Sequence, residues 1–504
     1  MKNVTPNKVI KYIQNAYHKY YDSAFWMKDE ILMQERQELL NESGLTAQDI
    51  FLEVVLPYPS EISIKDACNE IGLSENEADK LGKILFDKDG NFQLRKHQAQ
   101  SLVTSLSRNS SKRNVIVTSG TGSGKTESFL LPIFARLIKE RANVKSYPAN
   151  YWWDEHWEFQ KEWRGLRSNI NPEIKPAIRA LILYPTNALV EDQISRIRKA
   201  AFRSKELFGS PLFYFGRYTG ATEGGMYFPP SVLNKKDINR ISQIAEDIKK
   251  VDSTARALDN DSNVRAQFSD PRCGEMMTRW DMIEAAPDIL ITNVTMLNVM
   301  LLRKNEASIF EQTRKWLEES PDHEFSLIID ELHGYRGTQG TEVSLIVRNL
   351  LDRLGLKHDS PQLRCLGTSA SIDPNEGGLD YIEQFFGVSR DTFSIFPGDP
   401  LKPKADLPIK RENIDLINKI NPETPVENEK IFNEISPRTL LGAACLKSGA
   451  RGKRFVPSRI QDVGAILLGE NYSPDLLDQI FIAANLEAST SSQVPYLSFA
   501  LICF

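Results

Sequence analysis

Short apolar runs alternate with longer segments of helical periodicity between residues 92 and 372. Five runs are predicted to be buried strands, because each is short, apolar and followed by a polar or glycine-containing turn: 114–118, 180–184, 288–292, 325–329 and 363–368. Strands that alternate with helices predict an α/β fold with a doubly wound parallel sheet. Ligands of such sheets bind at the carboxyl ends of the strands. The residues that follow each strand are therefore the first candidates for a functional site.

The flanking regions lack this rhythm. Residues 1–90 are predicted to be a helical N-terminal region, and 376–504 a proline-rich, charged linker followed by a mostly helical, partial accessory domain. The α/β domain then spans 91–375, with insertions at 146–176 and 221–270. The apolar stretch 494–504 leads us to expect a truncated chain that stops inside a larger fold, because chain ends are usually solvated.

The first insertion holds four of the seven tryptophans, Trp152, Trp153, Trp157 and Trp163. Two interpretations remain open for them. Exposed aromatic rings can stack unpaired bases, whereas rings at this spacing more often pack a small core of their own.

Composition excludes several classes of protein. The chain has 504 residues, 41% hydrophobic and 26% charged, which is ordinary for a soluble globular protein and excludes a wholly disordered or collagen-like chain. The net charge of −5 neither favours nor excludes a nucleic-acid partner, because local patches decide that. The five cysteines form no C-x-x-C pair, which fits a cytoplasmic location. No apolar run reaches about 18 residues, so we expect no membrane partner.

A glycine-rich loop follows the first predicted strand. The loop reads Ser-Gly-Thr-Gly-Ser-Gly-Lys-Thr, and an apolar helical pattern follows it. Strand, loop and helix form the context of a Walker A phosphate loop, in which backbone N–H groups and a helix N-terminus face the phosphates. The alternative, a glycine-rich surface loop, leaves the Gly-Lys-Thr sequence at this place unexplained. The expected ATP contacts are Ser119, Gly120, Thr121, Gly122, Ser123, Gly124, Lys125 and Thr126, with Thr126 also on Mg²⁺.

Two acids follow the strand at 325–329. Asp330 would hold Mg²⁺ and Glu331 would orient the attacking water, if their strand lies beside that of the phosphate loop. Alone, an Asp-Glu pair after a strand is most often a solvated turn. Together with Lys125, the pair predicts a catalytic site for phosphoryl transfer. ATP and Mg²⁺ are thus the expected cofactors.

The motifs together resemble those of superfamily 2 DExH-box helicases. The segments 118–126, 330–333 and 368–371 resemble motifs I, II and III, in the order of that family. The resemblance implies a RecA-like ATP-binding domain. It also implies that Gln98 reads the adenine base and that His333, Thr368 and Ser369 couple the ATP site to movement.

Further segments of the chain resemble the nucleic-acid contacts of the same family: 184–189, 218–220 and 291–297. The implied contacts are to the strand backbone, and short polar side chains at strand ends suit phosphate oxygens. The residues concerned are Pro185, Thr186, Asn187, Gly220, Thr292 and Asn293. Four basic residues on the next predicted helix could add a positive surface or form a solvated face: Arg196, Arg198, Lys199 and Arg203.

A finer resemblance concerns the segments 277–282 (Met-Thr-Arg-Trp-Asp-Met) and 335–340 (Tyr-Arg-Gly-Thr-Gln-Gly). They are similar to segments of the large bacterial helicases of phage-defence systems, Druantia and DISARM among them. This similarity implies DNA, single-stranded or duplex, as substrate. It also implies other defence proteins as partners, and a second polypeptide is expected only as the carrier of a second RecA domain.

We find no arginine-finger sequence of the kind that the second RecA domain of these motors supplies. Such a finger is worth about 10³–10⁵ in rate, so we expect this chain alone to hydrolyse ATP slowly. Three hypotheses follow: an ATP-dependent helicase or translocase, an ATP-gated binding module that does not translocate, and another P-loop enzyme such as a kinase. A kinase has no use for the Thr-Asn and Thr-Ser-Ala-Ser segments.

Overall fold

A computed structural model describes most of the chain and divides it into two compact units, residues 60–399 and residues 1–59 together with 400–504. The described residues are 5–42, 50–55, 58–107, 111–120, 122–141, 144, 148–169, 173–258, 261–370, 372, 375–398, 416, 419–420, 428, 430–432, 435–449, 452–470, 472–490 and 498–502.

The larger unit is built on an eight-stranded sheet in which every neighbouring pair of strands is parallel. In spatial order the strands are β11 (Phe393–Pro397), β4 (Asn114–Thr118), β10 (Leu363–Ser369), β9 (Phe325–Ile329), β5 (Ala180–Tyr184), β8 (Ile289–Asn293), β6 (Phe215–Tyr218) and β7 (Glu275–Met276). The five predicted strands agree with β4, β5, β8, β9 and β10 to within one residue at either end. The predicted fold class, an α/β doubly wound parallel sheet of the RecA-like type, is confirmed.

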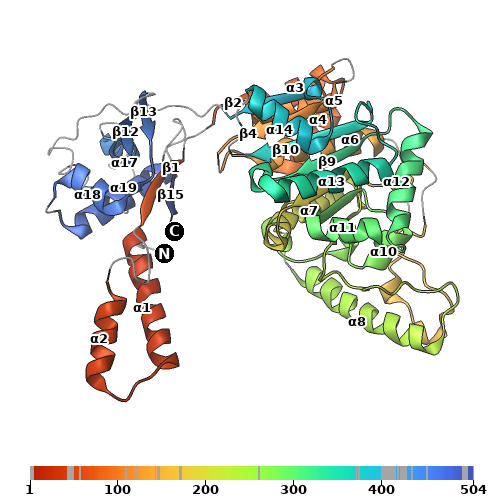
Figure 1. Ribbon diagram of the computed structural model, residues 1–504, viewed down its shortest axis with the longest axis horizontal. Coiled ribbons are helices and arrows are strands. Elements are labelled where there is room, and N and C mark those ends of the chain that lie inside the picture. Colours follow the sequence, from red (N-terminus) through yellow and green to blue (C-terminus); the bar gives the residue numbers. More distant parts are fainter. Residues whose placement is uncertain are drawn as a thin grey trace. The chain divides into compact units, whose positions relative to one another are not determined.

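Helices surround the sheet of the larger unit (Figure 1). Alternate strand residues are buried on its two opposite faces. Val115, Val117 and Ile182 face one apolar cluster, which is completed by the helices α3 (Ile64–Glu70), α4 (Glu75–Phe86), α5 (Lys96–Leu106), α6 (Lys125–Arg141) and α7 (Asn187–Phe208). Ile116 and Leu181 face the other cluster, which is completed by α10 (Arg279–Glu284), α11 (Val294–Leu302), α12 (Ala307–Glu319), α13 (Gly337–Arg353) and α14 (Glu376–Phe386). Apolar burial on both faces explains why the strands read as continuous apolar runs.

The unit boundaries differ from the predicted 91 and 375. The helices α3 and α4 belong to the larger unit because Ile64, Leu81 and Ile84 are fully buried in the same cluster as α6. The antiparallel pairing of β2 (Ser60–Ser63) with β3 (Gln93–Arg95) ties this segment to the start of α5. At the other end, β11 pairs along β4 and extends the unit past 375.

The tryptophans of the first insertion are buried. Trp152, Trp153, Trp157 and Trp163 expose between 1% and 8% of their surface, and their rings meet edge to face around Trp152. The rings are thus packed rather than available for base stacking, but they do not form a separate core: they belong to the apolar cluster on one face of the sheet and contact Trp280 of α10. The second insertion carries α8 (Lys235–Ala257) and α9 (Ser262–Arg265), and α8 packs on the tryptophan segment.

The smaller unit joins the two ends of the chain. An α-hairpin of α1 (Pro6–Ala24) and α2 (Glu30–Leu40) precedes β1 (Phe51–Val55), which pairs antiparallel with β14 (Ser458–Arg459) and β15 (Ser498–Ile502). The unit also contains α17 (Pro437–Ala444), the hairpin of β12 (Leu446–Gly449) and β13 (Gly452–Phe455), α18 (Ile460–Leu468) and α19 (Pro474–Thr490). This unit differs from the predicted division into 1–90 and 376–504, because β1 and β15 pair although they lie near opposite ends of the sequence. Most of the proline-rich linker lies outside the described residues.

None of the described helices is both long and apolar enough to cross a bilayer. The four described cysteines, Cys68, Cys273, Cys365 and Cys445, are buried and form no disulfide.

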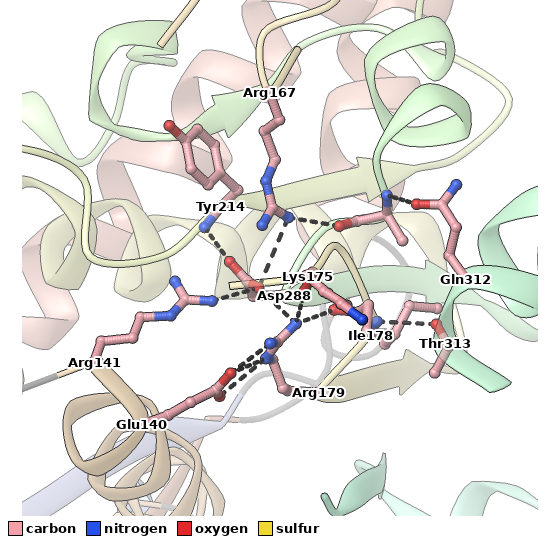
Figure 2. Close-up of polar contacts among 12 residues, drawn as sticks. Glu140, Arg141, Arg167, Lys175, Ile178, Arg179, Tyr214, Asp288, Gln312 and Thr313 are labelled. Carbon is pink, nitrogen blue, oxygen red and sulfur yellow. Dashed lines mark hydrogen bonds and ion pairs between the residues drawn. The ribbon is translucent and has the colours of Figure 1, made fainter. Parts of the chain in front are cut away.

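A buried charge cluster holds the amino ends of β5 and β8 together (Figure 2). Asp288 is fully buried and lies 2.7 Å from Nη2 of Arg141 and 3.2 Å from Nη1 of Arg179, with Arg167 at 3.7 Å. The amide of Tyr214 donates to its second oxygen at 2.8 Å. Burial alone would raise the pKa of Asp288, but the three guanidinium groups hold it well below its usual range. The carboxylate therefore links α6, the first insertion and two strands.

We expect Asp288→Asn to lower the free energy of unfolding by about 3–5 kcal/mol, because three buried guanidinium groups would then face a neutral amide. The measurement is urea unfolding followed by far-UV circular dichroism. Asp380→Asn is the matched control: Asp380 pairs with Arg390 at the surface, where such a pair is worth about 0–1 kcal/mol. Equal effects of the two substitutions would contradict the assigned role.

Candidate nucleotide-binding site and adjacent strand ends

The phosphate loop lies between β4 and α6, as the sequence predicted. Gly122 and Gly124 have φ values of +72° and +74°, a left-handed conformation that favours glycine. A Cβ atom on Gly124 would lie 2.4 Å from Nε2 of Gln98, so no larger side chain fits there without a shift. Thr121, one of the predicted ATP contacts, lies outside the described residues.

The start of α5 holds three consecutive carbonyl groups of the loop. Arg95 Nη1 donates to the Gly122 carbonyl at 2.8 Å, and Gln98 Nε2 donates to the Gly124 carbonyl at 3.1 Å. The His97 ring nitrogen Nε2 lies 3.0 Å from the Ser123 carbonyl. These three contacts hold the loop from the side of α5.

Gln98 was expected to face the base. In the structure its Nε2 donates to the loop and its Oε1 accepts from the Arg95 amide at 3.0 Å. Both ends of the side-chain amide thus bind protein, and contact with the base stays a prediction. Arg95 was missed, although it lies in the same segment and its charge beside the loop was a usable signal.

A pocket of about 400 Å³ opens beside the loop. The stacked rings of Phe86 and Phe92, 4.7 Å apart, form part of its apolar wall, and Gln98 and Arg196 are among its polar residues. An aromatic wall next to a phosphate loop suits a purine base. Sequence reasoning missed both rings, because a phenylalanine at the end of a helix (Phe86) or in a loop (Phe92) carries no signal of its own.

Lys125 and Glu331 come together from 206 positions apart. Lys125 Nζ donates to Glu331 Oε1 at 3.4 Å, so the predicted convergence of the loop and the acids is present. Beside them, the Thr368 hydroxyl donates to Asp330, and the Glu331 amide lies 3.2 Å from the same hydroxyl oxygen. Three strands, β4, β9 and β10, thus contribute polar groups to one edge.

Glu331 has an unusual backbone. Its φ is +53°, and it is one of two non-glycine residues with positive φ in the described part of the chain. Residues held in this region tend to occur at functional sites, where the surrounding structure maintains the strain. The strain turns the chain sharply into the short helix at Leu332–Gly334, so that Glu331 reaches Lys125.

Burial raises the pKa of the Asp330 carboxyl, and the neighbouring Glu331 charge raises it further, while the Thr368 hydroxyl and Lys125 lower it. A bound divalent cation would offset both raising effects. The donor set fits Mg²⁺, which takes one or two carboxylates together with phosphate oxygens and water. The predicted ligand Thr126 donates to Gln193 Oε1 at 3.3 Å. Among the described residues no group of three or more His, Cys, Asp or Glu forms a metal site by itself.

His333 contacts both the segment that carries the two acids, Asp330 and Glu331, and the segment that follows β10. Its Nδ1 lies 3.2 Å from Glu331 Oε2 and accepts from the Ala370 amide at 3.5 Å. Ser369, the third predicted coupling residue, accepts the Ser119 amide at 3.2 Å through its carbonyl. The Tyr381 hydroxyl on α14 donates toward the Tyr335 carbonyl at 2.7 Å and so braces the turn after Glu331. No sequence signal marked Tyr381.

The predicted nucleic-acid contacts gather at the same edge, on β5, β8 and β6. Asn293 Nδ2 donates to Asn187 Oδ1 at 2.5 Å, and Thr186 and Gly220 are exposed. Pro185 precedes them and is half-buried. Thr292 differs, because its side chain is fully buried and donates to the Tyr218 carbonyl at 2.6 Å. In this structure Thr292 supports the turn after β6.

The four basic residues of α7 each have a partner: Arg196 pairs with Glu127, Arg198 with Glu275, Lys199 with Asn263 and Arg203 with Asp87. A free positive surface on this helix is therefore not supported.

Comparison with known proteins adds family information. The family model for DEAD/DEAH box helicases matches residues 95–211. The chain is 31% identical over 429 residues to the Druantia protein DruE of Escherichia coli, covering 75% of this chain and 21% of that protein. It is 23% identical over 278 residues to the uncharacterized ATP-dependent helicase MJ1574 of Methanocaldococcus jannaschii, covering 55% of this chain and 26% of that protein. The chain thus spans about a fifth to a quarter of these relatives.

Solved structures with similarity include the DUF1998 helicase MrfA bound to DNA and AMPPNP, with 16% identity and a TM-score of 0.33 over 88% of this chain and 45% of that one. Another is the DEAD-box helicase Mss116 bound to ssRNA and UDP-BeF, with 14% identity and a TM-score of 0.37 over 76% of this chain and 55% of that one. Both scores are low, so the description of the fold rests on the sheet itself. The family match shows a DEAD/DEAH box helicase segment in this chain, and over three quarters of its length the chain is similar to the Druantia protein DruE.

Proposed function

We propose that this chain is the first motor domain of an ATP-dependent helicase or translocase that acts on DNA. The observation that carries the proposal is the contact of Lys125 with Glu331 beside Asp330, at the edge where the chain also leaves β5 and β8 and where Thr186 and Asn187 are exposed. A nucleotide site and a set of polar groups suited to a nucleic-acid backbone lie on one edge of the sheet. This arrangement allows the state of the bound nucleotide to alter the affinity for a nucleic-acid strand.

The residues of the site have distinct tasks in this proposal. The loop amides and Lys125 would bind the phosphates of ATP, while Asp330 and Thr126 would hold Mg²⁺. The bound metal would supply charge neutralisation of the phosphoryl group. Glu331 would orient and polarise the attacking water, and its present ion pair with Lys125 would open when the phosphates bind Lys125.

The nucleic-acid side of the proposal uses backbone contacts. Thr186, Asn187, Asn293 and Gly220 offer small polar groups suited to phosphate oxygens, which bind without regard to sequence. His333, which contacts both Glu331 and the backbone after β10, would carry the state of the nucleotide to neighbouring elements.

We further propose a role in defence against foreign DNA, on the similarity to DruE. The described residues contain one parallel sheet, and no arginine-finger sequence occurs in the chain. A second RecA domain, carried on another part of a longer protein or on a partner, would complete the catalytic site.

The ATP-gated clamp remains the second candidate, because the same edge could close on a strand without turnover. Glu331→Gln separates the two. For a motor we expect ATP turnover to fall by about 10²–10⁴ with ATP affinity retained, because only the positioning of the water is lost. Both quantities are measured by phosphate release and by fluorescent-nucleotide titration. Glu342→Gln, at an exposed site on α13, is the control. Phosphate release and ATP affinity that are both unchanged by Glu331→Gln would favour the clamp.

Turnover of the chain alone tests the need for a second domain. Typical enzymes turn over at about 10 per second, so the loss of an arginine finger predicts at most about 0.01 per second. Steady-state ATPase assays with single-stranded DNA, single-stranded RNA and no nucleic acid provide the measurement. Stimulation by DNA above RNA is expected. Several turnovers per second would refute the need for a further domain.

A further inference from the structure

The segment Thr278–Asp281 (Thr-Arg-Trp-Asp) is a junction between the second strand-end turn and the tryptophan-rich insertion. It opens α10, and Thr278 caps this helix by accepting the Asp281 amide at 3.1 Å. Its next three side chains bind backbone groups that are distant in sequence. The family resemblance singled out this segment, but the proposed nucleotide chemistry does not use it.

Arg279 binds the turn that follows β6. Its Nη2 donates to the Thr219 carbonyl at 2.8 Å and lies 3.5 Å from the Gly220 carbonyl, while Nη1 donates to the Gly225 carbonyl at 3.3 Å. The guanidinium group also stacks on Tyr218, 5.1 Å from the ring centre. One side chain thus gathers both ends of the turn 219–225.

Trp280 binds the same turn from a second side. Its Nε1 donates to the Tyr227 carbonyl at 2.7 Å and to the Gly224 carbonyl at 3.3 Å. Gly224 has a φ of +103°, and a Cβ atom there would lie 2.7 Å from this nitrogen. Glycine is required at this position both for conformation and for space.

Asp281 binds the tryptophan-rich insertion. It is fully buried and accepts from Trp152 Nε1 at 2.9 Å and from the Leu166 amide at 2.8 Å. Glu284, one turn further along α10, accepts from the Gly165 amide at 2.7 Å. The insertion and the turn are thereby fastened to the same short helix.

The charge of Arg279 makes the turn 219–225 suited to an anionic ligand. Arg279 exposes only 5% of its surface and forms no ion pair with any carboxylate in the described part of the chain. A buried charge without a counter-ion is costly, and carbonyl groups balance it only in part. Gly220, whose carbonyl oxygen lies 3.5 Å from Nη2 of Arg279, is exposed and has open space where a Cβ would be.

From this juxtaposition we propose that Arg279 is a positioning residue for nucleic-acid binding: it holds the 219–225 turn in shape and places positive charge beneath it, so that the turn accepts a backbone phosphate. This inference rests on the proposed function and deepens it. The tryptophan-rich insertion supports the turn through its contacts with α10. The ligand is a phosphodiester backbone, recognised without sequence preference.

Arg279→Gln in the full chain tests the inference, with binding of a fluorescein-labelled single strand of about 20 nucleotides measured by anisotropy at several salt concentrations. We expect affinity to fall about tenfold and the slope of log affinity against log salt to decrease by about 1, because one phosphate contact is lost. Affinity for ATP should stay within about twofold, since the nucleotide pocket does not include Arg279. Arg314→Gln, which removes a surface arginine paired with Glu318, is the matched control.

Trp280→Phe is a second variant that keeps the inference testable if Arg279→Gln prevents the chain from folding. It keeps a buried ring but removes the bond to the Gly224 carbonyl in the turn and the bond to the Tyr227 carbonyl just beyond it. We expect about a threefold loss of affinity with the thermal transition retained. DNA binding that stays as tight as in the wild type after Arg279→Gln and after Trp280→Phe would overturn the inference and leave the proposed function intact. A wild-type chain that binds neither DNA nor RNA would instead refute the proposed function, and this inference with it.

Discussion

The contact between Lys125 and Glu331 depends on a single constraint, the parallel register of β4, β10 and β9. Residue Ser369 of β10 stands beside Thr118 of β4, and Gly367 stands beside Ile329 of β9. All three strands therefore end at the same edge, and the groups that follow them share a small volume. A shift of one strand by two residues, about 7 Å, would separate the lysine from the acids. The apolar faces of the sheet, by fixing this register, determine the chemistry at its edge.

The two edges of the sheet differ in character. At the amino ends of β5 and β8, Asp288 and its three arginines form a closed cluster of opposite charges. At the carboxyl ends lie a strained Glu331, a carboxyl group with a raised pKa and an arginine that has no ion pair among the described residues. The charges at the amino edge are thus paired with one another, while the groups at the carboxyl edge would be stabilised by a nucleotide, a cation or a phosphate. This asymmetry is what a binding edge requires.

Local patterns predicted the parts of this structure that are local. Short apolar runs located five strands, and the Gly-Lys-Thr sequence located the phosphate loop, because each depends on consecutive residues. Contacts between distant segments were missed or placed differently. The pairing of β1 with β15, the bond from Tyr381 to the turn after Glu331, and the inward orientation of Thr292 arise only after packing. Gln98 shows the same limit, since the family resemblance predicts contact with the base while its side-chain amide in the structure donates to the phosphate loop. The roles of the site residues remain predictions that geometry supports.

The central claim is that one nucleotide is bound by Lys125 and by the acids after β9. The most direct test is calorimetric titration of the purified chain with ATP, with and without Mg²⁺, compared with Lys125→Ala and with Lys139→Ala on the same helix. The account predicts binding of one ATP that Mg²⁺ strengthens, a loss of about tenfold or more in affinity for Lys125→Ala, and no change for Lys139→Ala. Binding that is independent of Mg²⁺ and equal in all three proteins, or no binding at all, would contradict it.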